Sequence, residues 1–297
     1  MSSIRTVQPM VGRRFSDAFV PRSADRPSGP AADRRVDDAG LERLAGDGPS
    51  RRATDVPGLE ARWAPQVPAR SHLSEPTLAN WSPRPAREHA GAVEQYRKLA
   101  AQLIKAQEEH GVRSVLITSA VGAEGKSLTV ANLAATLAQS YHRRTLIIDA
   151  DQRAPRQHEI FNVANQRGLS EFFRGREDGV ATTVRLHECL TLLPAGQASG
   201  DPMAGLTSDR LKELIAEAAA AFDFVIIDAP PATVVPDAGI LAAMVDAVLL
   251  VIKAGSTLYP TIEQALAAVG RQRVLGTVLN YAEKAAVDRY PYGYGRR

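Results

Sequence analysis

Short, continuous runs of apolar residues alternate with helical patterns over the C-terminal two thirds of the chain. The runs hold Val, Ile and Leu without the polar–apolar alternation of a half-exposed strand, which is typical of strands covered on both faces. They predict strands over 114–119, 145–149, 190–194, 224–228, 247–252 and 274–280. We therefore expect a mostly parallel sheet of six or more strands.

Helical spacing of apolar residues separates these strands. In the first helical segment Val93, Tyr96, Leu99 and Leu103 recur at intervals of three and four, and Gly111 ends the pattern. Similar patterns predict helices over 91–109, 128–140, 209–221, 237–244 and 261–270. Strands that alternate with helices predict an α/β fold, with a mostly parallel sheet flanked by helices.

Residues 1–90 lack this patterning. They contain 11 of the 19 prolines and 14 arginines, but no lysine. Such a segment buries too little apolar surface to offset the entropy lost on ordering, so we predict a disordered N-terminal arm. The arm is either a solvated linker or, through pairs such as Arg13–Arg14 and Arg34–Arg35, a docking segment for a partner or for lipid headgroups.

Charge and composition narrow the class of protein. The formal net charge of +3 lies entirely in the arm, because residues 91–297 carry 22 basic and 22 acidic side chains, and this neutral body gives no reason to expect a nucleic-acid partner. A single cysteine, Cys189, excludes an internal disulfide and a cysteine-built metal site.

The longest apolar stretch, 239–252, is interrupted by Asp246 and is too short to span a membrane. The N-terminus also lacks the apolar core of a signal peptide. We expect a cytoplasmic protein that reaches the membrane through a partner.

The sequence AVGAEGKS at 120–127 lies between the first predicted strand and its helix. Small residues let such a loop turn its own N–H groups inward, and the helix N-terminus adds a partial positive charge, so the loop is suited to phosphate. Lys126 can reach the β and γ phosphates, and the Ser127 hydroxyl can bind Mg²⁺. The nucleotide contacts predicted here are Val121, Gly122, Ala123, Glu124, Gly125, Lys126 and Ser127. Ala120 replaces the glycine that usually opens the pattern.

Three carboxylates follow predicted strands. Asp149 and Asp151 end one strand, and Asp228 ends another. In an open parallel sheet such positions face the crevice where ligands bind, although any single acid can instead be a helix cap. Together with Ser127 they are the predicted ligands of one Mg²⁺, and Asp149 is also a candidate acceptor for a proton. The predicted catalytic residues are therefore Lys126, Asp149, Asp151 and Asp228.

The segments AVGAEGKS (120–127), LIIDADQRAP (146–155) and FDFVIIDAPP (222–231) resemble the Walker A, A′ and B motifs of bacterial tyrosine kinases, the autokinases of capsule and exopolysaccharide assembly. The resemblance covers about 91–297 and leaves the arm unexplained. It implies a phosphate-loop NTPase domain over 91–285, ATP and Mg²⁺ as cofactors, and ATP-dependent tyrosine autophosphorylation that regulates polysaccharide polymerisation and export.

Residues 290–297 read YPYGYGRR and contain Tyr290, Tyr292 and Tyr294, three of the seven tyrosines. The intervening Pro and Gly disfavour helix and strand, so we predict a flexible tail over 286–297. The tail either packs on or binds something, or carries its hydroxyl groups into the active site of another subunit. The resemblance implies that these tyrosines are the phosphate acceptors.

The resemblance also implies partners. Kinase domains of this family assemble as rings through a Glu-x-x-Arg-x-x-Arg helix, in which Glu94 and Arg97 match but Ala100 replaces the last arginine. A ring-like homo-oligomer is therefore expected to be weaker or differently built. The activator implied by the family is the cytoplasmic segment of a membrane adaptor, the polysaccharide co-polymerase, which would recruit the protein to the inner face of the membrane.

Two further residues have open roles. Arg153, which follows the A′ motif, either stabilises charge on the transferring phosphate or forms a surface ion pair, and Asn280, at a strand end, is a candidate for adenine recognition. The alternative function is an ATP-driven dimerisation switch of the plasmid-partition and septum-site type, which binds membrane or DNA. Those ATPases carry an extra lysine near the start of the phosphate loop, which the stretch 120–122 lacks. A catalytically weak structural partner of the polysaccharide machinery is a third possibility.

Overall fold

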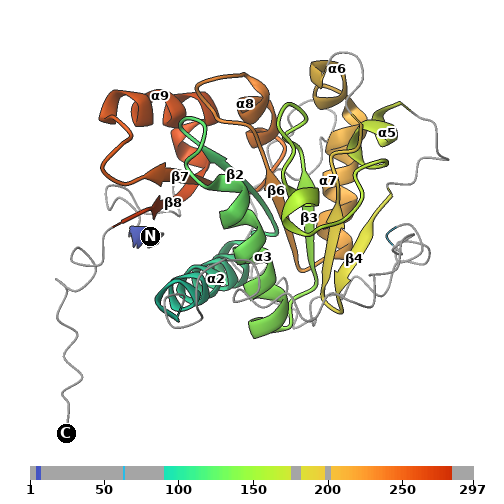
Figure 1. The fold of residues 1–297 in the computed structure, drawn as a ribbon, viewed down its shortest axis with the longest axis horizontal. Helices are drawn as coiled ribbons and strands as arrows, with labels where there is room; N and C mark the ends of the chain where they lie inside the picture. Colours follow the sequence, from blue (N-terminus) through green and yellow to red (C-terminus); the bar gives the residue numbers. More distant parts are fainter. Residues whose placement is uncertain (1–4, 8–62, 64–89, 175–181, 198–201, 283–297) are drawn as a thin grey trace, which may run out of the picture.

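The computed structural model describes residues 5–7, 63, 90–174, 182–197 and 202–282. Within them, one eight-stranded sheet lies between two layers of helices (Figure 1). Its strand order is β1-β8-β7-β2-β6-β3-β5-β4. The strands are β1 (Arg5–Val7), β2 (Ser114–Ser119), β3 (Thr145–Asp149), β4 (Val184–His187), β5 (Leu190–Leu193), β6 (Phe224–Asp228), β7 (Ala247–Lys253) and β8 (Val274–Asn280).

Helices lie between most consecutive strands, although not between β4 and β5, and they cover both faces of the sheet. The longer ones are α2 (Ala90–His110), α3 (Lys126–Tyr141), α7 (Asp209–Ala221) and α9 (Tyr259–Val269). The shorter ones are α4 (Gln157–Ile160), α5 (Leu169–Phe173), α6 (Pro202–Leu206), α8 (Asp237–Ala242) and the 3₁₀ turn η5 (Arg271–Arg273). Of the described helices, none is both long enough and apolar enough to cross a membrane.

The six strands predicted from apolar runs form the parallel block of the sheet, which confirms the predicted fold class. The two strands that the sequence did not indicate are the edge strands β1 and β4, and both pair antiparallel with their neighbours. In β4, buried Val184 and Leu186 flank exposed Arg185. Such short edge strands need only one covered face, so they leave no continuous apolar run in the sequence.

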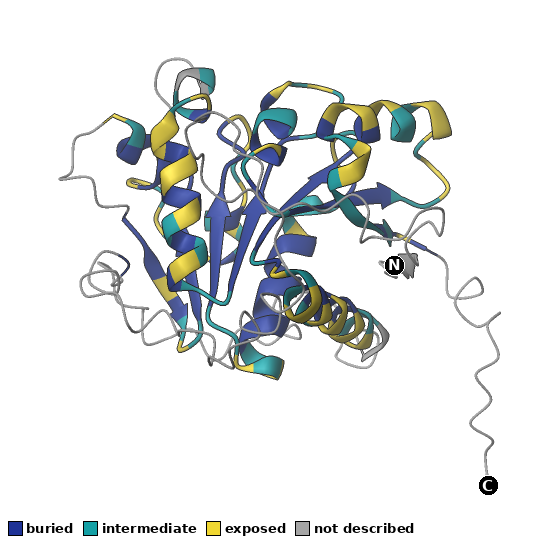
Figure 2. Ribbon diagram, turned by 180° about the vertical axis from the view of Figure 1, so that it is seen from behind, coloured by how far each residue is buried: buried dark blue, intermediate teal, exposed yellow. Residues whose placement is uncertain are grey.

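Each central strand contributes side chains to two cores. Val115 and Ile117 of β2 pack in the core shared with α2 and α3, whereas Leu116 between them packs with α7, α8 and α9 on the other face. Figure 2 shows the buried strands between helices whose outer surfaces are exposed. Burial on both faces explains why these strands are apolar throughout.

Two parts of the predicted N-terminal arm, Arg5–Val7 and Trp63, lie among the described residues and contact the folded domain. Arg5–Val7 pairs with β8, where it covers a sheet edge that would otherwise be open. Trp63 is 5% exposed and meets the Phe222 ring edge-on at 5.7 Å between ring centroids. An isolated indole gives no periodic signal in a Pro- and Arg-rich segment, so sequence patterning did not find this contact. Apart from Ala90, which begins α2, the rest of the arm lies outside the described residues, and its disorder stays a prediction.

Candidate active site

The phosphate loop over 120–127 joins β2 to α3 at the carboxyl edge of the parallel strands. Ala123 and Gly125 have positive φ angles of 62° and 86°, which turn the chain sharply into the helix that begins at Lys126. A Cβ on Gly125 would also meet the side-chain amide of Asn280, so the positive φ angle and this close approach both favour glycine there. The loop therefore delivers Lys126 and Ser127 to the N-terminus of α3, where anions are favoured.

Glu124, inside the phosphate loop, is 1% exposed. Its Oε2 accepts a 2.9 Å hydrogen bond from the Val121 N–H, and its Oε1 accepts one of 3.1 Å from the Lys253 N–H and another from the Thr257 hydroxyl. Asn280 Nδ2 donates to the Glu124 carbonyl oxygen at 2.9 Å. The Glu124 side chain thus fastens the loop to itself and to the end of β7. A carboxylate that faced the ligand would repel phosphate. The presence of a glutamate inside a phosphate-binding loop could therefore have indicated this structural role from the sequence.

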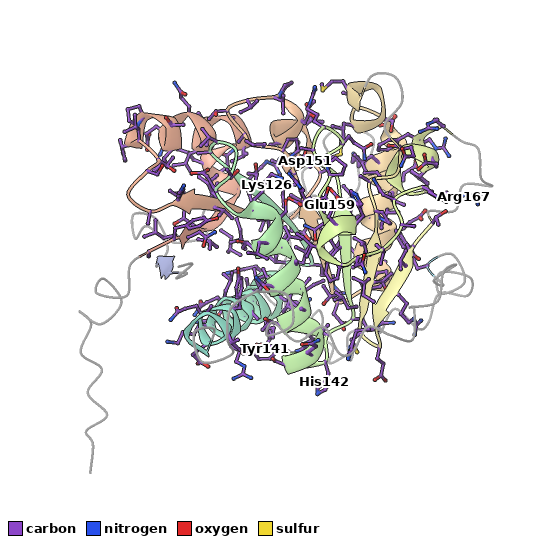
Figure 3. The ribbon with its side chains drawn as sticks, in the orientation of Figure 1. Lys126, Tyr141, His142, Asp151, Glu159 and Arg167 are labelled. Atoms are coloured by element: carbon purple, nitrogen blue, oxygen red, sulfur yellow. The ribbon has the colours of Figure 1, made fainter. Side chains whose placement is uncertain are left out.

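Lys126 contacts two of the acids that the sequence analysis predicts to lie near it. Its Nζ is 2.7 Å from Oδ2 of Asp151, 3.3 Å from Oδ1 of Asp228 and 3.2 Å from Oγ of Ser127. Figure 3 shows Lys126 and Asp151 close together at the start of α3, far from Tyr141 at its other end. Burial alone would lower the pKa of the Lys126 ammonium, but Asp228 and Asp151 outweigh that effect and raise the pKa above its ordinary value. The lysine therefore stays positively charged.

Asp149 and Asp228 are register partners on the neighbouring strands β3 and β6, and neither is exposed to solvent. Burial and the nearby Asp228 raise the pKa of Asp149 to about 8. Burial also raises the pKa of Asp228, although Lys126 and hydrogen bonds from Gln157 and Ser127 oppose the rise. Two buried carboxylates lie side by side here, and the positive charge of Lys126 can balance only one of them. This edge of the sheet therefore favours a bound proton or cation.

The oxygen atoms at the site suit Mg²⁺, a hard cation that prefers oxygen ligands. Oδ1 of Asp149 is buried with no hydrogen-bond partner, which leaves it available to a cation or a metal-bound water. Asp151 is committed elsewhere, since its Oδ2 accepts from Lys126 and its Oδ1 from the Ala154 N–H at 3.0 Å. Among the described residues no three acidic, histidine or cysteine side chains gather in the manner of a metal cluster. In this structure Asp151 therefore pairs with Lys126, and the convergence of all three acids on one Mg²⁺ stays a prediction.

Two residues with open roles have defined contacts. Arg153 forms a two-pronged ion pair with buried Asp237, at 3.1 Å from Nε and 3.3 Å from Nη2, which favours the ion-pair alternative. The Asn280 amide bonds the phosphate loop through Nδ2 and accepts from the Tyr281 N–H through Oδ1 at 2.9 Å. The role of Asn280 in adenine recognition remains a prediction. The tail residues Tyr290, Tyr292 and Tyr294 lie outside the described residues.

Gln157 is the site residue that the sequence reasoning missed. Its Nε2 donates to Oδ2 of Asp228 at 2.7 Å and to the Ser127 carbonyl oxygen at 3.0 Å. Its backbone N–H donates to Oδ2 of Asp149, also at 3.0 Å. Gln157 stands eight positions after Asp149 with no motif around it, so only the fold brings it to the carboxylates.

A phosphate loop at the start of a helix, with acids at the ends of adjacent parallel strands, defines a phosphate-loop NTPase. In agreement, the family described as AAA domain matches residues 112–278. The chain is 36% identical over 209 residues to the tyrosine-protein kinase YwqD of Bacillus subtilis, covering 69% of this chain and 86% of that protein. The chain therefore belongs to the bacterial tyrosine-protein kinase family.

Two further comparisons agree with this assignment. The kinase domain of Escherichia coli tyrosine kinase ETK superposes with a TM-score of 0.63 and 30% identity, over 71% of this chain and 84% of that one. The succinoglycan biosynthesis transport protein ExoP of Rhizobium meliloti is 34% identical over 214 residues. That match covers 67% of this chain but only 27% of ExoP. The chain thus matches most of YwqD and of the ETK kinase domain, but only part of ExoP.

Proposed function

We propose that this protein is a Mg²⁺- and ATP-dependent protein-tyrosine autokinase that regulates exopolysaccharide or capsular polysaccharide polymerisation and export. The observation that carries the proposal is the position of Lys126, a charged lysine at the phosphate loop within bonding distance of Asp151 and Asp228. Membership of the tyrosine-kinase family supports tyrosine as the phosphate acceptor. The relative named for succinoglycan biosynthesis supports polysaccharide assembly as the process that the kinase regulates.

Phosphoryl transfer requires positioning and charge neutralisation more than covalent participation by the protein. Lys126 and the backbone N–H groups of the loop neutralise the phosphate oxygens of ATP. Asp149 accepts the proton of the attacking tyrosine hydroxyl, the new bond joins that oxygen to the γ-phosphorus, and ADP takes the electrons of the broken bond. Ser127 and the carboxylates Asp149, Asp151 and Asp228 would hold Mg²⁺, which would neutralise charge on the phosphates.

The acceptors in this proposal are Tyr290, Tyr292 and Tyr294, presented to a neighbouring subunit. Glu94 and Arg97, 3.8 Å apart on α2, have half-exposed side chains that another subunit can reach. Ala100, in contrast, is fully buried, so it adds nothing to an intersubunit contact. We therefore expect a weak ring-like oligomer, strengthened by the cytoplasmic segment of a membrane co-polymerase that recruits the kinase to the inner face of the membrane.

The alternative, an ATP-driven switch that binds membrane or DNA, keeps the same nucleotide site but transfers no phosphate to protein. The absence of lysine from 120–122 and the kinase relatives favour the tyrosine kinase. A structural partner with little catalytic power would likewise keep the fold without efficient transfer.

The test is incubation of purified protein with γ-labelled ATP and Mg²⁺, followed by mapping of the modified residues. We expect label on the tail tyrosines. Lys126→Met should remove at least about 99% of it, because the substitution removes the ammonium group that neutralises the phosphate oxygens in this proposal.

Lys105→Met is the matched control, since Lys105 lies exposed on α2 and pairs only loosely with Glu109 at 3.7 Å. It should label as wild type does. Normal labelling of folded Lys126→Met would overturn the assignment of the site, and ATP hydrolysis without protein labelling would support the switch instead.

A further inference from the structure

We propose that Gln157 is a positioning residue that holds the magnesium-facing carboxylates, Asp149 and Asp228, in place against the phosphate loop. The inference rests on the proposed Mg²⁺·ATP site and adds to it a residue outside the three motifs. Gln157 has no exposed surface, and its bonds reach all three motifs: Ser127 in the phosphate loop, Asp149 at the end of β3 and Asp228 at the end of β6.

The side-chain chemistry at this position is specific. Both neighbours of Nε2, Oδ2 of Asp228 and the Ser127 carbonyl oxygen, are acceptors, so the amide nitrogen must face them. Among neutral side chains, only a primary amide can donate two hydrogen bonds from one nitrogen. A lysine or arginine could also donate twice, but it would add a second positive charge beside Lys126.

The two bonds have different consequences. The bond to Asp228 occupies Oδ2 of the carboxylate, and its other oxygen, Oδ1, lies towards Lys126. The bond to the Ser127 carbonyl holds the first turn of α3, which carries the Ser127 hydroxyl. One amide therefore sets the relative position of two predicted metal ligands that lie 101 residues apart in the chain.

The backbone of the same residue orients the third ligand. The N–H groups of Arg156 and Gln157 both donate to Oδ2 of Asp149, at 3.1 and 3.0 Å. This leaves Oδ1 of Asp149 and Oε1 of Gln157 as buried oxygens without a donor. Both are suited to a proton-donating group such as a metal-bound water, which is the usual role of residues just outside a metal's direct ligands.

The experiment measures the affinity of the full chain for a fluorescent ADP analogue, N-methylanthraniloyl-ADP, in Mg²⁺ and in EDTA. ADP avoids turnover, so binding is read separately from catalysis. Gln157→Met keeps the length of the side chain but removes both N–H donors. Mg²⁺ raises the affinity of the wild type for the analogue by some factor, measured as the ratio of the affinity in Mg²⁺ to that in EDTA. We expect this ratio to be about 10- to 100-fold smaller in Gln157→Met, which is the usual effect of removing such a partner. In EDTA the variant should bind within about threefold of wild type, because none of the hydrogen bonds of Gln157 involves the phosphate-loop N–H groups that would meet the phosphates.

Gln152→Met is the matched control. Gln152 is also a buried glutamine after β3, but its amide bonds Ala195 and Ser170, away from the carboxylates. It should keep the full effect of Mg²⁺. If Gln157→Met does not fold by circular dichroism, Gln157→Asn replaces it, since an amide one methylene shorter cannot keep both bonds and should show the same loss.

The outcomes separate the two proposals. A folded Gln157 variant with the same gain from Mg²⁺ as Gln152→Met would overturn the role of Gln157 and leave the kinase assignment intact. A wild-type protein whose ADP affinity does not respond to Mg²⁺ would overturn the metal site, and with it this inference.

Discussion

Two aspartates at opposite edges of the sheet show how the same side chain serves structure in one place and chemistry in the other. Asp246 precedes β7 at the amino edge, where its Oδ2 accepts from the N–H groups of Arg113 and Ser114 and from the Ser114 hydroxyl, at 2.8 to 2.9 Å. Asp149 ends β3 at the carboxyl edge, where one oxygen has two backbone donors and the other is buried with none.

The surroundings explain the difference. Asp246 is only partly buried, and its bonds fix the chain entering β2 and β7. Asp149 has no exposed surface and faces Asp228, so its charge is opposed by burial and by a like charge. A carboxylate supplied with donors holds the fold, whereas a carboxylate left short of donors can bind a proton or a cation. The predictions below test that distinction.

The largest expected effect is on activity. Asp149→Asn and Asp228→Asn should each lower autophosphorylation by about 10² to 10⁴-fold, because an amide is a poor Mg²⁺ ligand and cannot accept a proton. Initial rates of γ-phosphate incorporation measure this loss. Asp246→Asn is the control at the other edge of the sheet and should stay within about threefold of wild type. Equal losses at the two edges would remove the functional distinction between them.

The second effect is on stability. Asp246→Ala should lower the free energy of unfolding by about 1–3 kcal/mol, because it deprives two backbone N–H groups and a hydroxyl of their acceptor. Urea denaturation followed by circular dichroism measures it. Ser114→Ala removes the bond that the hydroxyl donates to Oδ2 and the one that it accepts from the Asp246 N–H, but it leaves both backbone N–H groups bonded to Asp246, so it should cost less than Asp246→Ala. If Asp246→Ala left the free energy of unfolding unchanged, water would satisfy these donors equally well.

The smallest effect is a pH dependence in nucleotide-free protein with EDTA. The pKa of Asp149 is about 8 in the folded state, above the value of about 4 expected when unfolded. Between these values the folded protein holds a proton that the unfolded chain releases, so this group makes the free energy of unfolding fall as pH rises. Its contribution is at most about 1.4 kcal/mol per pH unit.

Asp149→Asn cannot ionise and should therefore lose that slope. The measurement is urea denaturation of both proteins at pH 5, 6 and 7. We expect the free energy of unfolding of the variant to rise relative to that of the wild type as the pH rises. A constant difference between the two across this range would contradict the raised pKa of Asp149.

Much of the site could be predicted because it is encoded locally. The loop at 120–127 lies between a strand and a helix, and Asp149 and Asp228 end apolar runs, so their meeting at one edge follows from parallel pairing. Glu124 and Gln157 differ. Glu124 stood within the predicted loop, but its bonds to Lys253 and Thr257 cross about 130 residues of sequence. Gln157 carries no pattern at all.

The sequence by itself determined the parallel core, the phosphate loop and the family, because apolar runs, glycine and charged residues act over a few neighbouring positions. Only the tertiary structure decided that Asp151 serves Lys126, that Gln157 bridges the motifs, and that β1 and Trp63 join the domain. Hydrogen-bond donors and acceptors are satisfied by whatever group the fold brings within about 3 Å. Sequence spacing does not contain that information for residues a hundred positions apart.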